Sequence, residues 1–233
     1  MKVSIVVPVL DEATTIAATL RGLRADFPGC ELLVVDGNSG DDTAALAAPL
    51  ARVITSARGR ARQLNAGAAA TSGEVLWFVH ADTRPTPEAL PQLRAAMADP
   101  AIVGGGCSIR FDRDTPALRY LAWASNRRAR WLREIYGDQA MFVRREMFAA
   151  LGGFPDLPLM EDLEFCHRLR RRGALVVLPA TVTASARRFT EHGTWRMIAF
   201  MQYLKLLYAL GVNPKDIHRR YAAGPKRLRP TRK

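Results

Sequence analysis

Charged side chains follow four apolar runs in the first hundred residues of this 233-residue chain. The groups that follow the runs are, in order, Asp11-Glu12, Asp36, Arg58-Gly59-Arg60 and His80-Ala81-Asp82. Acidic side chains hold ribose or sugar hydroxyls and a hard divalent cation, while arginines bind phosphate oxygens. A nucleotide diphosphate with Mg²⁺ or Mn²⁺ is a ligand that needs both kinds of group.

The elements that must position these groups alternate in type along the chain. Apolar, β-branched runs predict strands at residues 3–9, 32–35, 52–55 and 75–79, and apolar residues at helical spacing predict helices at 16–23, after Asp41-Asp42, and at 61–70. This alternation indicates an α/β fold with a mostly parallel central sheet between helices. Because ligands bind beyond the carboxyl ends of parallel strands, the four charged groups are expected in one crevice.

The second half of the chain is less regular. We expect strands at 102–111, 140–143 and 175–178, and helices at 116–133, 163–172 and 195–210. No repeat or linker interrupts the pattern. The simplest organisation is one domain over residues 1–190, followed by a C-terminal extension over 191–233 that consists of an amphipathic helix and a basic tail, loose from Pro225.

The apolar segment 195–210 leaves two alternatives open. It packs against the domain or against a second subunit in a homodimer, or it lies in the plane of a membrane surface, where the basic tail favours anionic lipid. No run of about 18 apolar residues occurs, so no segment is expected to span a bilayer. The short apolar start does not resemble a signal peptide, and three dispersed cysteines fit a reducing cytosol. We therefore expect a cytoplasmic protein, with a peripheral position on the inner membrane face as the alternative.

The formal net charge of +12 lies almost entirely in the second half. Residues 1–110 contain 10 Lys+Arg and 11 Asp+Glu, whereas residues 111–233 contain 24 and 11. This asymmetry indicates an anionic partner. A basic nucleic-acid-binding protein would be expected to interleave aromatic residues with its arginines or to contain a recognised module, and the sequence shows us neither, so we do not expect nucleic acid as a partner.

Five motifs in order resemble a family 2 glycosyltransferase of the GT-A fold. They are Val-Pro-Val-Leu-Asp-Glu (7–12), Val-Val-Asp-Gly-Asn-Ser-Gly-Asp-Asp-Thr (34–43), Gly-Arg-Ala-Arg-Gln-Leu-Asn-Ala-Gly (59–67), Ser-Gly-Glu-Val-Leu-Trp-Phe-Val-His-Ala-Asp (72–82) and Met-Glu-Asp-Leu-Glu-Phe-Cys-His-Arg-Leu (160–169). The stretches 59–65, 80–83, 136–139 and 185–189 resemble more narrowly the bacterial transferases associated with arsenosugar biosynthesis and radical-SAM/selenium-domain gene neighbourhoods. A nucleotidyltransferase of similar fold remains an alternative, although it would have a Gly-rich basic loop after the first strand.

The resemblance implies a role for particular residues in binding a nucleotide-diphosphate sugar, UDP-linked, with Mg²⁺ or Mn²⁺. The nucleoside side would be formed by Pro8, Glu12 and Asp36, and the diphosphate and sugar would be held by Arg60, Arg62, Asn65, His80, Ala81, Asp82, Arg187 and Arg188. The family's Asp-x-Asp element reads His80-Ala81-Asp82 here, so its first carboxylate is missing and Asp82 is the expected metal ligand.

The resemblance also implies an inverting transfer. In such an in-line displacement a carboxylate removes the proton of the acceptor hydroxyl while cations stabilise the departing diphosphate. Asp162 is the expected base, with Glu161 as its orienting partner. Gly137, Asp138 and Gln139 would line the side of the acceptor, a small molecule or a lipid-linked group.

Overall fold

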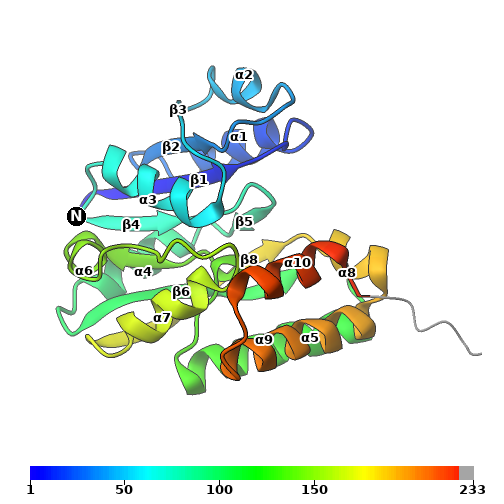
Figure 1. Ribbon diagram of the computed structural model, residues 1–233. Helices are drawn as coiled ribbons and strands as arrows, with labels where there is room; N and C mark the ends of the chain where they lie inside the picture. The colour runs from blue at the N-terminus through cyan, green and yellow to red at the C-terminus, as the bar shows by residue number, and fades with distance from the viewer. Residues whose placement is uncertain (226–233) are drawn as a thin grey trace, which may run out of the picture.

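The computed structural model describes residues 1–225 and contains one mixed eight-stranded sheet with helices on both faces (Figure 1). The strand order is β3-β2-β1-β4-β7-β6-β8-β5. The first four strands in this order are parallel, and β7 and β5 introduce antiparallel pairs. The predicted α/β class and sheet between helices are thus confirmed. The residues predicted as a loose tail, from 226 onward, lie outside the described part.

The parallel half of the sheet follows the apolar runs closely. Its strands are β1 (Val3–Val9), β2 (Glu31–Asp36), β3 (Arg52–Thr55) and β4 (Val75–Phe78). They are connected through α1 (Ile16–Asp26), α2 (Thr43–Ala47) and α3 (Arg60–Ala70). Gly67 of α3 allows a close approach to the sheet, because a Cβ atom there would lie 2.3 Å from a methyl carbon of Val6. Because β1 pairs in parallel with both β2 and β4, the carboxyl ends of these three strands meet at one edge, as expected.

The second half of the sheet contains β5 (Thr83–Pro85), β6 (Ile102–Phe111), β7 (Phe142–Arg144) and β8 (Ala174–Ala184). The strand predicted at 175–178 is longer in the structure. It continues because β8 pairs with β6 along most of its length, through a register shift, and then with β5. The structure also adds α4 (Ala89–Met97) and α6 (Arg145–Ala150), which the sequence pattern did not reveal.

Two apolar cores hold the layers together, one on each face of the sheet. On one face α1 and α4 pack over Trp77 and neighbouring strand residues, and on the other α3, α6 and α7 (Glu161–Leu169) pack around Phe78, Phe154 and Phe165. The ring centroid of Phe154 lies 5.0 Å from that of Phe78 and 4.6 Å from that of Phe165.

The C-terminal helices form a third layer beside α7. They are α8 (Arg187–His192), α9 (Thr194–Ala209) and α10 (Pro214–Ala223), and α9 lies next to α5 (Pro116–Leu132) along one side of the molecule (Figure 1). A small separate core joins α9 and α10 to α7 through Met160, Leu163, Leu204 and Ile217. One face of α9 thus packs against the domain, which is the first of the two alternatives for residues 195–210. No helix in the described range 1–225 is long and apolar enough to cross a membrane.

Candidate active site

A cavity of 310 Å³ opens at the carboxyl edge of the sheet. Its lining combines strand-end residues with residues of α3, α7 and the C-terminal helices. The polar members are Arg60, His80, Asp82, Thr83, Tyr136, Asp138, Asp162, Ser185, Arg188, Lys205 and Tyr221. Of the predicted diphosphate, base and acceptor residues, the cavity brings together Arg60, His80, Asp82, Asp138, Asp162 and Arg188. The C-terminal helices complete the wall with apolar residues such as Met197 and Met201.

The adjacent carboxylates Glu161 and Asp162 begin α7, where negative charge complements the helix N-terminus. Glu161 is 1% exposed and accepts a hydrogen bond from Nε of Arg60. Arg60 Nη2 also lies 3.6 Å from Asp162 Oδ2. One guanidinium therefore contacts both carboxylates, and the Arg60 side chain points to Glu161 and Asp162.

Asp162 is held in place by the backbone. Its Oδ2 accepts a hydrogen bond from the N–H of Gly137 at 2.9 Å, and its Oδ1 accepts one from the N–H of Leu163 at 2.8 Å. Burial acts to raise the pKa of Asp162, but the Arg60 guanidinium and these two N–H groups outweigh it, and the pKa is lowered. Asp162 is therefore an ionised, oriented carboxylate on the cavity wall.

Residues 137–139 form a single 3₁₀ turn between α5 and β7, and its members differ in role. Gly137 packs against the His80 ring so closely that a Cβ atom would lie 2.9 Å from it. Burial raises the pKa of the Asp138 carboxyl, and Asp138 Oδ1 is buried with no hydrogen-bond partner within the described chain. An unpartnered buried oxygen on a cavity wall is suited to accept a hydrogen bond from a ligand hydroxyl.

Asp82 lies at the mouth of the cavity, beyond the end of β4. Desolvation by the surrounding atoms and the nearby Glu12 carboxylate raise its pKa, while Arg187 and Arg60 act in the opposite direction. Burial and the charge of Arg60 lower the pKa of His80 to about 4, so its imidazole is neutral near pH 7. The following Ala81 is buried and accepts a hydrogen bond from Thr19 through its carbonyl oxygen.

The donor set at Asp82 bears on the expected Mg²⁺ or Mn²⁺ ion. Within residues 1–225 no three His, Cys, Asp or Glu side chains are grouped so as to hold a metal ion. A site formed by three such side chains is therefore not present in this range. A single carboxylate at the cavity mouth does fit a cation whose other ligands are diphosphate oxygens and water, an arrangement common for Mg²⁺.

The expected nucleoside side is built on the ends of β1 and β2. Asp36 is 5% exposed, and its carboxylate accepts hydrogen bonds from the N–H and hydroxyl groups of Ser39. Gln63 of α3 joins the two strand ends, because its amide N–H₂ donates to the carbonyls of Val9 at 2.7 Å and Val35 at 3.0 Å. Pro8, in β1, and Glu12, which accepts from Thr15 at 2.8 Å, lie at this edge but do not line the cavity.

Three predicted site residues make structural contacts away from the cavity. Arg62 pairs with the exposed Asp156, with Nη2 2.7 Å from Oδ2. Asn65 exchanges two hydrogen bonds with the backbone of Phe154, at 2.8 and 2.9 Å. Gln139 is fully buried, accepts from Arg128 at 2.9 Å and donates to the carbonyl of Cys107 at 3.2 Å. None of the three is among the residues that line the cavity, and their roles in ligand binding stay predictions.

The two arginines at the start of α8 also differ. Arg188 lines the cavity, with its guanidinium carbon 4.0 Å from the centroid of the Tyr221 ring, and donates a hydrogen bond to the Tyr221 hydroxyl. Burial lowers the pKa of Arg188. Arg187 is exposed and acts on Asp82 only through its charge. Their role in binding the diphosphate stays a prediction.

The sequence did not point to Tyr136 and Lys205. The Tyr136 ring lies between two cations, with Arg128 3.6 Å and Lys205 4.6 Å from its centroid. Burial and the nearby Arg128 charge lower the pKa of Lys205 to about 8. The available signal was that Lys205 is an isolated charge within the apolar stretch from Met197 onward, but only packing against the cavity shows what the lysine faces.

The chain resembles curated glycosyltransferases of bacteria along most of its length. It is 27% identical to "Uncharacterized glycosyltransferase Rv1514c" of Mycobacterium tuberculosis, over 97% of this chain and 87% of the relative. It is also 27% identical to "Probable glycosyltransferase YdaM" of Bacillus subtilis, over 84% of this chain and 52% of the relative.

Solved structures share the fold at lower identity. The S. aureus TarS 1–349 structure in complex with UDP-GlcNAc superposes with a TM-score of 0.64 at 20% identity, covering 79% of this chain and 58% of TarS. The mannosyltransferase PcManGT from Pyrobaculum calidifontis, in complex with GDP-Man and Mn²⁺, has a TM-score of 0.66 at 20% identity, covering 87% of this chain and 62% of PcManGT. The chain thus spans less than two thirds of either structure.

The family model described as "Glycosyl transferase family 2" matches residues 4–178, which include β1, the carboxyl ends of the parallel strands and the Glu161-Asp162 pair. Together with the site geometry, this match shows that the chain belongs to glycosyl transferase family 2.

Proposed function

We propose that this protein transfers a sugar from a nucleotide-diphosphate sugar, UDP-linked, to an acceptor hydroxyl with inversion at the anomeric carbon. The observation that carries the proposal is the placement of Asp162. An ionised carboxylate, fixed by two backbone N–H groups and Arg60, shares one cavity with Asp82 at the strand edge. A base and a diphosphate-binding group must flank the same anomeric carbon for an in-line displacement.

In this proposal each residue has a stated task. The reacting acceptor hydroxyl donates its hydrogen bond to Asp162, and a second hydroxyl of the acceptor donates to Asp138 Oδ1. The proton of the reacting hydroxyl passes to Asp162 as its oxygen bonds to the anomeric carbon. The anomeric carbon–oxygen bond breaks, and its electron pair leaves with the diphosphate. Arg188 contributes positive charge on that side. Glu161 does not take the proton, because its carboxylate is buried against Arg60 and orients that guanidinium.

Asp82, with His80 beside it, is the residue that would hold a divalent cation in this proposal. The support is its exposed carboxylate at the cavity mouth and the Mn²⁺ named with GDP-Man in the related mannosyltransferase structure. When bound, such an ion would supply positive charge to the diphosphate leaving group. UDP is proposed as the nucleotide because UDP-GlcNAc accompanies the TarS structure, with GDP as the alternative to test.

The acceptor in this proposal is a small molecule or a lipid-linked group with a free hydroxyl. The narrower resemblance of the motifs at 59–65, 80–83, 136–139 and 185–189 supports adding sugar conjugates of arsenic- or selenium-containing metabolites to the acceptor panel. A nucleotidyltransferase activity has less support, because the matched family transfers glycosyl groups.

The proposal is tested by incubating the protein with a panel of UDP- and GDP-sugars and Mn²⁺ and following hydrolysis or transfer by mass spectrometry. UDP with Mn²⁺ should raise the melting temperature of the wild type. Asp82→Ala should remove this effect, while Asp42→Ala, an exposed carboxylate at the start of α2, should retain it. A full response in Asp82→Ala would show that the diphosphate binds elsewhere.

Asp162→Asn separates the base from binding. This variant should retain the UDP response but lose about 10²–10⁴-fold in turnover, the usual contribution of a positioned general base. The exposed Asp156→Asn is the matched control and should turn over normally. Retention of the donor's anomeric configuration in the product, read by NMR, would contradict the inverting mechanism.

A further inference from the structure

An exposed aromatic face runs along α5. Tyr120, Trp123 and Trp131 recur at helical spacing and lie largely outside the fold, and Trp131 is 70% exposed. Arg127 lies between the two tryptophans, with its guanidinium carbon 5.1 Å from the Trp123 ring centroid and 3.7 Å from that of Trp131. This interleaving of aromatic rings and arginine corrects the expectation from sequence that the chain shows none.

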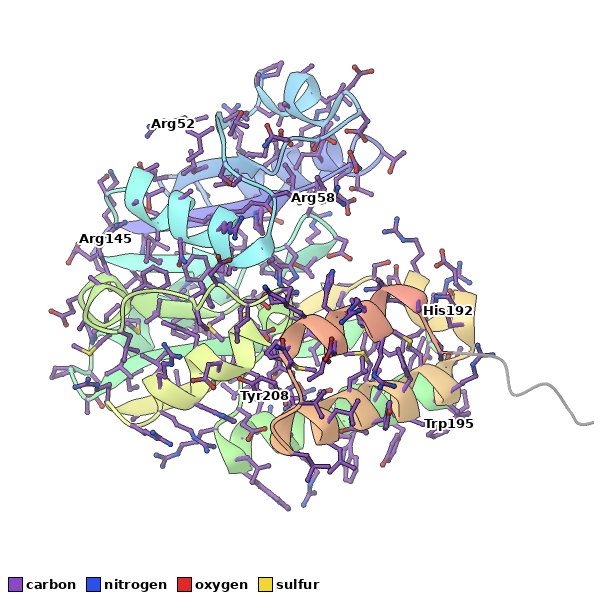
Figure 2. All side chains as sticks on the ribbon, in the orientation of Figure 1. Arg52, Arg58, Arg145, His192, Trp195 and Tyr208 are labelled. Atoms are coloured by element: carbon purple, nitrogen blue, oxygen red, sulfur yellow. The ribbon has the colours of Figure 1, made fainter. Side chains whose placement is uncertain are left out.

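The face continues onto α9. Its exposed residues are Trp195, Arg196, Ala199, Gln202, Tyr203, Leu206 and Ala209, followed by Leu210. Lys205 is only partly exposed and lines the candidate active site instead. The two helices adjoin, because the Trp195 ring centroid lies 5.5 Å from that of Tyr120 (Figure 2 labels Trp195 at the start of α9). The exposed side of α9 is therefore mostly apolar, as is its buried side, and an exposed apolar surface of this kind marks a binding site for a partner.

The charge of this face has one sign. Neither α5 nor α9 contains an Asp or Glu, whereas the exposed residues of the two helices include Arg119, Arg130 and Arg196. Nearby acids are few; Asp114 pairs with Arg119, and Glu134 lies against His167 and Arg170. The partner of this face must therefore accept aromatic and aliphatic side chains and also supply negative charge.

We propose that the face formed by α5 and α9 binds the headgroup region of an anionic lipid bilayer. Tryptophan and tyrosine rings favour the boundary between headgroups and acyl chains, and arginines beside them contact lipid phosphates. Exposed aliphatic residues such as Leu206 and Leu210 gain from that boundary. A nucleic-acid strand would contact the arginines and stack on the rings, but it offers these leucines no apolar environment. A second copy of the chain would bring arginine against arginine across the interface. The proposal does not depend on the transferase reaction.

A second cavity supports the same face. This cavity of 400 Å³ lies between the two helices, lined by Leu121, Leu132, Ile198 and Gln202 among others, and it shares Tyr136, Asp138 and Lys205 with the candidate active site. The two cavities are therefore neighbours, and a bilayer bound to this face would lie beside the cavity that contains Asp162.

The tryptophans of the chain make a direct test. Of four tryptophans, Trp77 is fully buried, and Trp123, Trp131 and Trp195 lie on this face. Vesicles of mixed phosphatidylglycerol and phosphatidylcholine should shift the emission of the full-length protein to the blue and protect it from acrylamide. Vesicles of phosphatidylcholine alone should produce at least tenfold weaker binding in the same titration.

Matched variants assign the binding to this face. Trp131→Ser with Leu206→Ser should weaken vesicle cosedimentation at least tenfold, while Leu46→Ser, an exposed leucine on the distant α2, should not. Arg127→Glu should weaken it more than Arg21→Glu on α1. All these variants should retain the wild-type melting temperature, because the changed side chains are exposed or partly exposed.

Three outcomes would overturn the proposal. The first is an emission spectrum that anionic vesicles leave unchanged. The second is vesicle binding that the variants on α5 and α9 do not alter. The third is protection of the tryptophans without lipid, either by dimerisation at higher protein concentration or by single-stranded DNA added in place of vesicles.

Discussion

Gly137 is the residue whose replacement the site should tolerate least. A Cβ atom at this position would lie 2.9 Å from the His80 ring and 3.3 Å from Asp162 Oδ2, so either the ring or the base must move. We expect Gly137→Ala to reduce turnover at least tenfold, because small displacements of a catalytic group are costly. The measurement is turnover at saturating donor.

Gly22 in α1 is the matched control for this substitution. A Cβ atom there meets only the flexible end of Arg84, and alanine favours the helix more than glycine does. Gly22→Ala should therefore leave turnover unchanged and maintain or raise stability. Equal turnover in both variants would show that the contact between Gly137 and His80 does not position Asp162.

Lys205 links a pKa to stability. Its pKa is lowered from 10.5 to about 8 because burial disfavours the ammonium, and Arg128 adds to this effect while Asp138, Asp162 and Glu134 oppose it. Below pH 8 the folded state therefore bears the cost of burying this charge. The unfolded chain retains the proton up to about pH 10.5. The free energy of unfolding therefore rises with pH between about pH 8 and pH 10.5.

Lys205→Met tests this link. At pH 7 the variant should be more stable than the wild type by about 1–2 kcal/mol, a shift discounted for the partial exposure of the side chain. Urea unfolding at pH 7 and pH 10 should show the difference narrowing as the pH rises. A constant difference would mean that Lys205 does not titrate in this window.

Single residues show which features of the candidate site could be predicted from the sequence and which could not. Asp36 and Asp82 could be placed at the sheet edge because each follows a continuous apolar strand, and that depends only on local pattern. Arg62 and Gln139 could not be separated from ligand-facing residues, since their partners, Asp156 and Cys107, are distant in sequence. Side-chain direction is decided by such tertiary contacts.

At the scale of elements, the loop before α7 depends on one side chain of α3. Asn65 bonds both the N–H and the carbonyl of Phe154, whose ring lies within the second core. Asn65→Ala leaves two backbone groups without these partners and should destabilise the fold by about 1–3 kcal/mol. Arg62→Ala, one turn earlier on the same helix, removes only an exposed ion pair and should cost at most about 1 kcal/mol. Urea denaturation of both variants measures the contrast; equal losses would contradict it.

The difference between local pattern and tertiary contact also explains which elements could be predicted from the sequence. The parallel strands and α1 through α3 are continuous runs with their own periodicity, and their bounds agree with the prediction within a few residues. The three-residue β5 exists because it pairs with the end of β8, and β8 extends to Ala184 for the same reason. Short strands of this kind are determined by their partners rather than by local preference.

At the scale of the whole molecule, the C-terminal helices α9 and α10 pack against α7, which begins with the carboxylates of the candidate active site. Leu204 of α9 is 0% exposed in the small core with Met160 and Leu163, which adjoin the Glu161-Asp162 pair. Leu204→Ala should destabilise the protein by about 2–5 kcal/mol, because it leaves a cavity in that core. Leu206→Ala, two residues later and 57% exposed, should change stability by no more than about 0.5 kcal/mol. Because the lost packing lies against α7, we expect Leu204→Ala also to lower turnover at temperatures below its unfolding transition. Normal turnover together with a small loss of stability would support the predicted boundary at residue 190, with 191–233 as a dispensable extension.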